Sequence, residues 1–389
     1  MKEGWEVKKL GEVCEIVGGS TPKTNESTYW DGEHFWVTPA ELDGSKYISS
    51  TTRKITDSGV KSAHLQLLPK GTVLLSSRAP IGKVAITTTP MYCNQGFKNL
   101  ICSDSLFNEY AYWFLLCNKD YLNALGTGAT FKEISKKVVG EIPIPVPPLP
   151  TQEKIVSELD CINSILEKKR EQLKELDALA QSIFYDMFGD PIQNEKGWEV
   201  KKLKDAVVEM FLGPFGSALK TDCYVDKDSS FCMVYEQKHA IKKTLALETH
   251  YISKNKFDSL SRFEVHAGDF IMSCRGTIGE IYRLPSDAPI GIIHPSLMKI
   301  RIKEEVYEPT FFIRLLTAII KNESTSGNCV QMAITAKELG ARNATLPPLS
   351  LQQSFASKIE AIEKQKELIK RSITEVETLL ASRMQYYFG

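Results

Sequence analysis

Two stretches of the chain repeat apolar residues with the alternating four- and three-residue spacing of a coiled coil. The first stretch covers residues 151–189 and the second covers residues 347–389. Residues at these spacings share one face of a helix, so both stretches predict long helices with an apolar stripe. The positions that we expect to form the seam between the helices are Leu159, Ile162, Leu173, Leu176, Ile183, Ile359, Ile362, Ile373, Val376 and Leu380.

The chain also repeats itself at the level of short motifs, which is the mark of a duplicated domain. Four motifs recur in the same order in each half: GWEVKKL (4–10 and 197–203), GTVLLSSRAPIG and GDFIMSCRGTIG (71–82 and 268–279), VPPLPTQ and LPPLSLQ (146–152 and 346–352), and FG (188–189 and 388–389). We therefore divide the chain into two globular domains, residues 1–150 and 190–346, each followed by one of the predicted helices.

An isolated helix would expose its apolar stripe, so the two helices are expected to pack together. The duplication favours an approximately twofold, antiparallel arrangement. A helix of about 38 residues would be ~57 Å long, enough to hold two globular domains apart like a ruler. Proline clusters precede both helices, and Thr151 and Ser350 are the expected helix caps.

The globular parts mix short apolar or β-branched runs with helical patterns at 108–125 and 309–321. The runs VLLSS, KVAITTT, KNLICS, DFIMSC, GEIYRL and GIIHPSLMKIRI are typical of strands. The predicted fold class is therefore α/β or α+β, repeated once and combined with a two-helix antiparallel coiled coil.

Composition narrows the function without deciding it. The 48 basic and 48 acidic residues cancel, which excludes a polycationic nucleic-acid coat but permits local basic faces. The nine cysteines include no CxxC pair, which disfavours a zinc site and a disulfide framework. No window has the roughly 18 to 20 uninterrupted apolar residues of a membrane-spanning helix, so we expect a cytoplasmic protein without a membrane partner.

Catalytic motifs are missing from the sequence. We find no phosphate-binding loop of the GxxxxGK type, no HExxH and no GxSxG. The stretch EMFLGPFG at 209–216 vaguely resembles a nucleotide-binding turn, but no NPPY or DPPY stretch accompanies it, which disfavours a free-standing methyltransferase. No metal or cofactor is expected on this chain.

Two loops rich in small residues carry a nearby cation: GGSTPKT at 18–24 and GPFGSALKT at 213–221. Backbone amides and hydroxyls there could approach a DNA phosphate, although exposed turns have the same composition. The candidate contacts in these loops are Thr21, Lys23, Ser217 and Lys220.

The repeated SSRAPIGK and SCRGTIGE segments place Arg78 and Arg275 after an apolar strand, beside Ser77 and Thr277. Arginine there could bind a phosphate or a guanine edge, or could tie the strand end to a carboxylate or carbonyl, which is the more frequent role. Sequence reading is expected where the halves diverge, at 20–66 and 220–262. The cationic residues of those stretches are Lys23, His34, Lys46, Arg53, Lys54, Lys220, Lys238, His239, Lys242 and Lys243, and weaker candidates elsewhere are Lys98, Lys132, Lys136 and Lys299.

The motifs follow one another in the order GWEVKKLGEV, GGSTPKT, LSSRAPIGKVAI, NQGFKNL, TGATFKEISKK and IPIPVPPLPTQEKIV, and then comes a heptad helix ending in MFGDP. The whole plan is then repeated in the second half. This arrangement resembles the specificity subunit of type I restriction-modification systems. The resemblance spans essentially the whole chain. It implies two target recognition domains, each reading one half of a bipartite, asymmetric DNA site, and two helices that act as the spacer.

The resemblance also implies partners. Two methylation subunits would bring S-adenosylmethionine, and motor-nuclease subunits would use ATP and Mg²⁺, so this chain would be the non-catalytic subunit of the complex. Specificity subunits of methylase-nuclease fusion systems are an alternative of the same class. The alternative of another class is a coiled-coil scaffold that binds no DNA.

The two halves depart from each other in one region. TFKEISKK before the first proline cluster has only the looser counterpart VQMAITAK (330–337), and NQG (94–96) becomes HPS (294–296). We therefore expect the second domain to present its loop before the helix differently.

Overall fold

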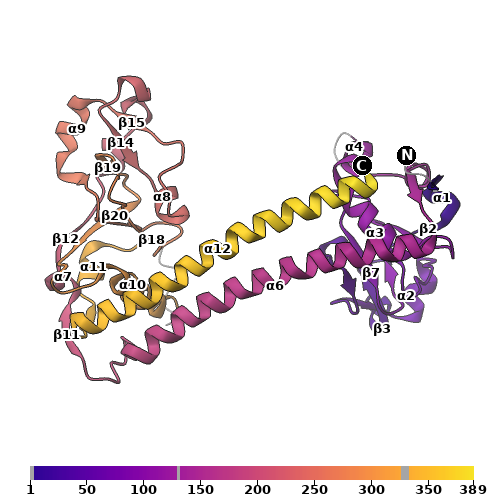
Figure 1. The fold of residues 1–389 in the computed structure, drawn as a ribbon, viewed down its shortest axis with the longest axis horizontal. Coiled ribbons are helices and arrows are strands. Elements are labelled where there is room, and N and C mark those ends of the chain that lie inside the picture. Colours follow the sequence, from indigo (N-terminus) through magenta and orange to yellow (C-terminus); the bar gives the residue numbers. More distant parts are fainter. Residues whose placement is uncertain (1–3, 129–131, 326–332) are drawn as a thin grey trace. The chain divides into compact units, whose positions relative to one another are not determined.

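The structure, a computed structural model, describes residues 4–128, 132–325 and 333–389. The chain forms two compact units (Figure 1). The first unit comprises Met1–Gln172 and Ile369–Gly389, and the second comprises Leu173–Leu368. Each unit therefore contains one globular part, one end of the first long helix and the opposite end of the second. The domain boundaries at residues 150, 189 and 346 were drawn from sequence motifs and not from compactness, and they stay a prediction.

The first unit is a mixed α and β structure. Its strands are β1 (Glu6–Lys9), β2 (Cys14–Gly18), β3 (Trp30–Val37), β4 (Tyr47–Ile48), β5 (Lys54–Ile55), β6 (Val73–Leu75), β7 (Val84–Thr87), β8 (Tyr92–Cys93), β9 (Lys98–Cys102) and β10 (Pro143–Val146). Its helices are α1 (Leu10–Val13), α2 (Asp57–Ser62), α3 (Asn108–Cys117), α4 (Lys119–Leu125), α5 (Lys136–Gly140) and the start of α6 (Leu149–Phe188).

The second unit has the same mixture of elements. Its strands are β11 (Glu199–Lys202), β12 (Val207–Leu212), β13 (Tyr224–Val225), β14 (Cys232–Tyr235), β15 (Tyr251–Ile252), β16 (Glu264–Val265), β17 (Phe270–Ser273), β18 (Ile281–Arg283), β19 (Gly291–Ile293), β20 (Leu297–Ile302) and β21 (Asn343–Leu346). Its helices are α7 (Leu203–Ala206), α8 (Gln237–Lys242), α9 (Lys254–Leu260), α10 (Pro309–Thr325), α11 (Ala336–Gly340) and the start of α12 (Leu349–Phe388).

The central sheets of the two units have matching topology. The order β2-β9-β6-β7 in the first unit corresponds to β12-β20-β17-β18 in the second. The register also matches, because Val73 pairs with Leu100 in one sheet and Phe270 with Ile300 in the other. The predicted mixed fold class and the repeated plan are confirmed.

The repeated GWEVKKL motif contributes one strand of a separate two-stranded ribbon in each unit. Strand β1 pairs antiparallel with β10, and β11 pairs in the same way with β21. The next residue closes the ribbon, since the Leu10 amide donates to the Ile142 carbonyl and the Leu203 amide to the Arg342 carbonyl, both at 2.9 Å. The motif therefore ties the start of each globular part to the strand that precedes its long helix.

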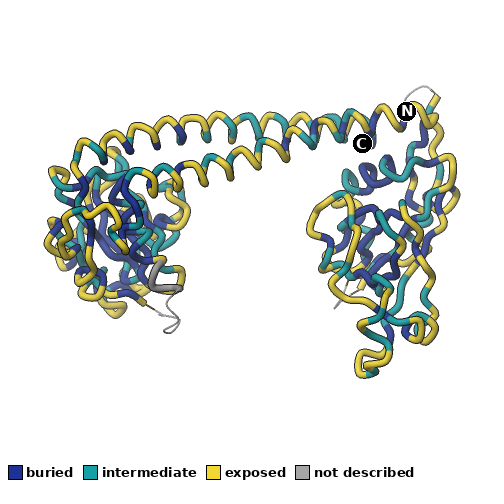
Figure 2. Tube along the Cα trace, turned by 90° about the horizontal axis from the view of Figure 1, so that it is seen from below, coloured by how far each residue is buried: buried dark blue, intermediate teal, exposed yellow. Residues whose placement is uncertain are grey.

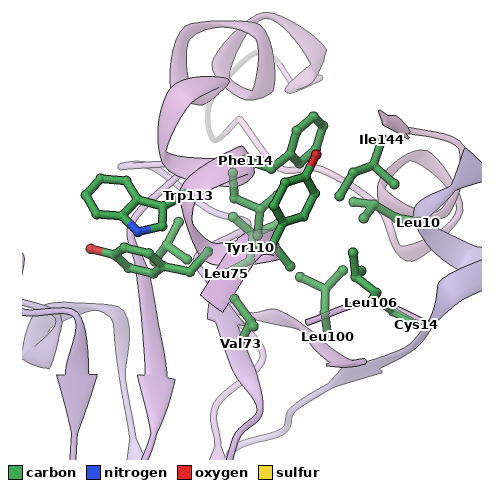
Figure 3. Close-up of a cluster of buried hydrophobic side chains, with 14 of the residues drawn as sticks. Leu10, Cys14, Val73, Leu75, Leu100, Leu106, Tyr110, Trp113, Phe114 and Ile144 are labelled. Carbon is green, nitrogen blue, oxygen red and sulfur yellow. The ribbon is translucent and has the colours of Figure 1, made fainter. Parts of the chain in front are cut away.

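Helix α3 covers the central sheet of the first unit and fills its main core (Figure 3). Tyr110, Trp113 and Phe114 project from the helix among Val73, Leu75 and Leu100 of the sheet strands, all of them buried. The predicted helix 108–125 is two helices, because the chain turns at Asn118, whose side-chain amide donates to the Phe114 carbonyl at 2.9 Å. Asparagine favours such local bonds over helix continuation.

Buried glutamines fix the start of each long helix. The Gln152 side chain accepts from the Phe107 amide (2.8 Å) and donates to the carbonyls of Ser105 and Pro147. Gln352 makes the equivalent bonds to Glu308, Val306 and Pro347. Both side chains are fully buried, so these bonds replace those that water would otherwise supply.

The expectation that Thr151 and Ser350 cap the helices is wrong, because α6 begins at Leu149 and α12 at Leu349. The Pro148 carbonyl accepts from the amides of Thr151 and Gln152, which makes Pro148 the capping position. Pro150 is tolerated because its missing N–H would have no partner in the first turn.

The two long helices run antiparallel within each unit. In the first unit, Glu158 of α6 accepts hydrogen bonds from Arg383 and Tyr387 of α12, and Arg170 pairs with Glu377 at 2.7 Å. In the second unit, Asp177 of α6 lies 2.7 Å from Lys366 of α12, and the Phe184 and Phe355 rings are 5.7 Å apart. Lys366 and Arg383 are polar interruptions of the heptad pattern, and carboxylates of the other helix neutralise both.

Along both long helices, buried and half-buried positions alternate with exposed ones (Figure 2). The residues predicted for the seam are all buried or half-buried. Leu159, Ile162, Ile359 and Ile362 are buried; Leu173, Leu176, Ile183, Ile373, Val376 and Leu380 are half-buried. Within the described residues, no helix is long and apolar enough to cross a bilayer.

Candidate nucleic-acid interface

Three segments singled out in the sequence meet in the first unit: the loop GGSTPKT, the segment after β6 and the turn NQG. The Ser20 amide donates to the Cys93 carbonyl at 3.1 Å, and the Ser77 amide donates to the Gly96 carbonyl at 2.8 Å. A Cβ atom at Gly19 would lie 2.1 Å from the Cys93 oxygen, so only glycine permits this approach. The small residues of the loop therefore bring separate backbones together.

The second unit brings the corresponding segments together in the same way. The Gly213 amide donates to the Leu297 carbonyl at 2.9 Å, and the Cys274 amide donates to the Ser296 carbonyl at 3.0 Å. A Cβ atom at Gly213 would lie 2.3 Å from the His294 oxygen. The framework of the site is thus repeated, while the side chains that it carries differ.

A carboxylate holds two cations at the site of the first unit. Arg78 Nε donates to Glu133 Oε2 at 2.9 Å, and Lys98 Nζ donates to the other oxygen at 3.1 Å. Burial raises the pKa of Glu133, but the hydrogen bonds from Lys98 and Arg78 outweigh it and leave the pKa below its usual value. We call these three residues the Glu133 cluster. Ser77 lies beneath it, fully buried, with its hydroxyl 3.4 Å from Lys98 Nζ.

The site of the second unit lacks this carboxylate. Arg275 and Ala333 form the backbone bridge that corresponds to the one between Arg78 and Glu133, so alanine stands in place of Glu133. Within the described residues, the guanidinium of exposed Arg275 has no ion pair. The loop is held instead through its backbone, because Gln237 Nε2 donates to the carbonyls of Arg275 (2.8 Å) and Thr277 (3.3 Å).

Glu236 collects polar partners beside Gln237. Its carboxylate accepts from Thr249 Oγ1 at 2.9 Å, lies 2.9 Å from Lys238 Nζ and lies 3.0 Å from His250 Nδ1. Burial raises the pKa of Glu236, but the hydrogen bonds from Lys238, Thr249 and His250 outweigh it and keep the pKa below the usual value. Predicted contact Lys238 is thus paired within the protein.

The other predicted DNA contacts are dispersed over the two units. Thr21 is half-buried and donates a hydrogen bond to Gln95. Lys23, Lys54, Lys132, Ser217, Lys220, Lys242 and Thr277 are exposed. The ammonium of Lys54 lies 5.1 Å from the centre of the Phe35 ring. The structure therefore brings together Ser77, Arg78 and Lys98, and places Thr277 beside Arg275, but does not gather the remaining cations.

Two other candidates are engaged inside the protein, Lys46 from the divergent stretch 20–66 and Lys299 from the weaker group. Lys299 is 3% exposed and lies 2.6 Å from Glu209 and 3.3 Å from Asp269, so it is unavailable to DNA in this structure. Lys46 lies 2.8 Å from Glu109 and 2.6 Å from Asp160. Sequence letters alone cannot separate such cations from free ones, because their partners come from distant parts of the chain.

Sequence reasoning missed the partners Glu133 and Gln237. The available signal was the alignment of TFKEISKK with VQMAITAK, which sets Glu133 opposite Ala333. The motif residues 130, 131 and 330–332 lie outside the described residues. Arg53 was one of several cations in a divergent stretch, and the structure distinguishes it by stacking its guanidinium 3.8 Å from the centre of the Trp30 ring.

Comparison with known proteins gives the family. A model of the "Type I restriction modification DNA specificity domain" matches twice, over residues 2–176 and 195–378. The chain belongs to this family. The two matches cover the two sequence halves, so both halves carry a specificity domain.

Curated relatives of the family match part of the chain. The specificity subunit of the type I restriction enzyme MjaIX from Methanocaldococcus jannaschii is 39% identical over 220 residues, which are 52% of this chain and 51% of that protein. The Escherichia coli EcoR124I/EcoR124II specificity subunit is 30% identical over 172 residues, 42% of each. These alignments span about half or less of the relatives' length.

Solved structures of specificity subunits share the fold over the whole chain. A chain from a study of complex assembly and conformational transition of the type I R-M system has a TM-score of 0.68, with 17% identity, covering 100% of this chain and 98% of that one. The S subunit of a type I system from M. genitalium has a TM-score of 0.53, with 14% identity, covering 99% and 96%. At these identities the likeness concerns the fold.

Proposed function

We propose that this chain is the DNA-recognition subunit of a type I restriction-modification complex and reads a bipartite, asymmetric site with one specificity domain per half-site. The observation that carries the proposal is the double family match, which covers the two halves of a chain whose units repeat one framework around Arg78 and Arg275. Phosphate contacts would orient each domain, and the divergent side chains would read base edges.

The proposal includes partners and a location. Two methylation subunits would dock on the chain and bring S-adenosylmethionine, and motor-nuclease subunits would bring ATP and Mg²⁺. The solved relative that comes from a study of complex assembly supports such partners. The chain itself would be non-catalytic, would bind no cofactor and would act in the cytoplasm.

Salt-dependent DNA binding tests the proposal against the scaffold alternative. The complete chain, co-purified with its methylation subunits, is titrated with a fluorescein-labelled duplex at increasing salt. Each neutralised phosphate contributes a slope of about −0.9 in a plot of log affinity against log salt, so the affinity should fall steeply. Absence of binding at every salt concentration would favour the scaffold.

The spacer role has its own experiment. Residues 164–170 of α6 and 373–379 of α12, which lie in the same unit, are deleted together so that the heptad register survives. Removing seven residues shortens a helix by ~10 Å, about three base pairs at 3.4 Å per pair. Sequencing of methylated adenines should then show a shorter gap between half-sites, whereas an unchanged gap rejects the ruler. Deleting only 164–170 is the control that breaks the pairing.

A further inference from the structure

Glu133 binds two cations of the first unit that the sequence predicts as DNA contacts, one of them the repeated arginine. Each of its two oxygens binds a different cation, Arg78 through Oε2 and Lys98 through Oε1. A phosphate offers the same arrangement of anionic oxygens to arginine and lysine. The first unit therefore already contains an anion, the Glu133 carboxylate, that is bound to both Arg78 and Lys98.

The backbone of Glu133 is fixed independently of its side chain. Its amide donates to the Thr127 carbonyl at 3.0 Å, its carbonyl accepts from the Thr127 amide at 3.1 Å, and the following amide of Ile134 donates to Ser77 at 2.9 Å. The ion pairs can consequently open without loss of this local structure. The side chains of Arg78 (45% exposed) and Glu133 (35%) are also accessible, whereas that of Lys98 is only 14% exposed.

The second unit carries the same backbone bridge without the anion. Ala333 is exposed beside Arg275, and the loop is held by Gln237 through backbone carbonyls rather than through the guanidinium. As far as the described residues go, the five N–H donors of the Arg275 guanidinium are left for an external acceptor. The two units present the repeated arginine in opposite states, paired in one and available in the other.

We propose that Glu133 is an internal competitor for DNA phosphate, which lowers the affinity of the first unit for its half-site relative to that of the second unit. This inference rests on the proposed DNA-binding function and assigns specific roles within it. Arg78 and Lys98 bind phosphate only after they leave Glu133, whereas Arg275 binds it directly. An exposed ion pair shifts an equilibrium by roughly 1.4- to 5-fold, so the competition adjusts affinity and does not abolish binding.

The first variant is Glu133→Gln, which keeps the shape of the side chain and removes its charge. We expect a mixed-sequence duplex to bind roughly two- to fivefold more tightly, with a steeper salt dependence. The matched control is Glu141→Gln, because Glu141 is also an exposed carboxylate of the first unit, paired with Lys9 at 2.6 Å. A gain of equal size in the control would mean that only net charge matters, and would overturn the proposal.

A double-mutant cycle ties the gain to the paired cations. Glu133→Gln is repeated in a chain that carries Arg78→Ala and Lys98→Ala, where no cation remains to be released. The proposal requires that Glu133→Gln then changes the affinity no more than Glu141→Gln does. A gain that persists in full in this background would contradict it.

The reciprocal variant transfers the competitor to the second unit. Ala333→Glu should weaken duplex binding by roughly two- to fivefold, and should have no such effect in a chain carrying Arg275→Ala. Thermal unfolding of every variant reports whether the fold is retained. Failure of the wild-type chain to bind duplex would reject the proposed function together with this inference, whereas normal wild-type binding with unresponsive Glu133→Gln and Ala333→Glu variants would reject the inference alone.

Discussion

The two units use one framework for different distributions of charge. At the site, Glu133 of the first unit corresponds to Ala333 of the second. In the central sheet it is the second unit that carries the charged residues. Thr72 and Asn99 of the first unit correspond there to Asp269 and Lys299 of the second. Duplication has thus kept the residues that set backbone geometry and changed those that set electrostatics. This is the division that the proposed function, in which the two domains read unlike half-sites, would require.

The aromatic anchors at the ends of the long helices give the largest expected effect. Phe188 packs in the second unit against Phe184, Phe311 and Phe355 at ring distances of 4.6–5.4 Å, and Phe388 packs in the first unit against Tyr110 at 5.2 Å and Phe114 at 6.0 Å. Phe188→Ala should lower the free energy of unfolding by about 3–5 kcal/mol. Phe388→Ala should cost less, because its ring is less enclosed (7% exposed against 2%). Urea unfolding measures both, and equal costs would show that the anchors are equivalent.

The buried charges of the second unit give the next largest effect. Asp269 is 2% exposed and accepts hydrogen bonds from Arg301 at 2.6 and 2.8 Å, close to Lys299. Asp269→Asn should cost about 1.5–3 kcal/mol, because buried Lys299 and half-buried Arg301 lose one of their two carboxylate partners and keep only Glu209. The first-unit equivalent Thr72→Val removes one neutral bond, to the Pro69 carbonyl, and should cost about 0.5–1.5 kcal/mol. Urea unfolding of both variants would show whether the neutral version of the sheet is the more tolerant one.

Mild acid should lower the stability of the second unit more than that of the first, and this difference should be smaller than the two effects above. Burial lowers the pKa of His239 and His294 in the second unit below the ordinary value of 6.5. The unfolded chain then takes up protons first, so stability is present above about pH 6.5 and is lost as the pH falls further. The loss cannot exceed about 1.4 kcal/mol per pH unit for each histidine. His239 is fully buried and His294 is half-buried, whereas in the first unit His34 is half-buried and His64 is exposed.

Hydrogen exchange between pH 7.5 and 5.5 would test this difference, after correction for the intrinsic exchange rate. Protection of α10 in the second unit should decrease more than protection of α3 in the first. The matched variant is His294→Asn, which installs the residue that the first unit carries at position 94 and should reduce the pH response. If protection changed equally in both helices, the buried histidines would not cause a difference in acid stability between the two units.

The repeat and the apolar periodicity predicted most of the fold. The heptad stripe placed both long helices within two residues of their starts, and the duplicated motifs indicated that two units share one plan. The errors were local: Asn118 breaks a helix that periodicity alone continues, and Pro148 rather than Thr151 caps α6. Both depend on individual side-chain and backbone hydrogen bonds, which periodicity does not encode.

The candidate site was less predictable than the fold. The sequence identified the repeated arginines and left open whether each ties down its strand or contacts DNA. Among the described residues, Arg78 is paired with a carboxylate and Arg275 is not, and the difference lies in one residue 55 positions further along the chain from Arg78. In the sequence Lys299 looks like the other lysines, yet in the structure it is buried and paired with Glu209 and Asp269. Ionic partners that are brought together by tertiary folding leave no local pattern to read.

The division of the long helices has a consequence for biosynthesis. The core of the first unit includes Phe388 and contacts from Leu380 and Met384, all in the last residues of the chain, whereas the second unit ends at Leu368. A ribosome that translates this protein therefore makes the N-terminal globular part first but completes its core last. The later-made second unit is the first to have all of its core residues, because the first unit lacks Phe388 until the final turns of α12 have been made.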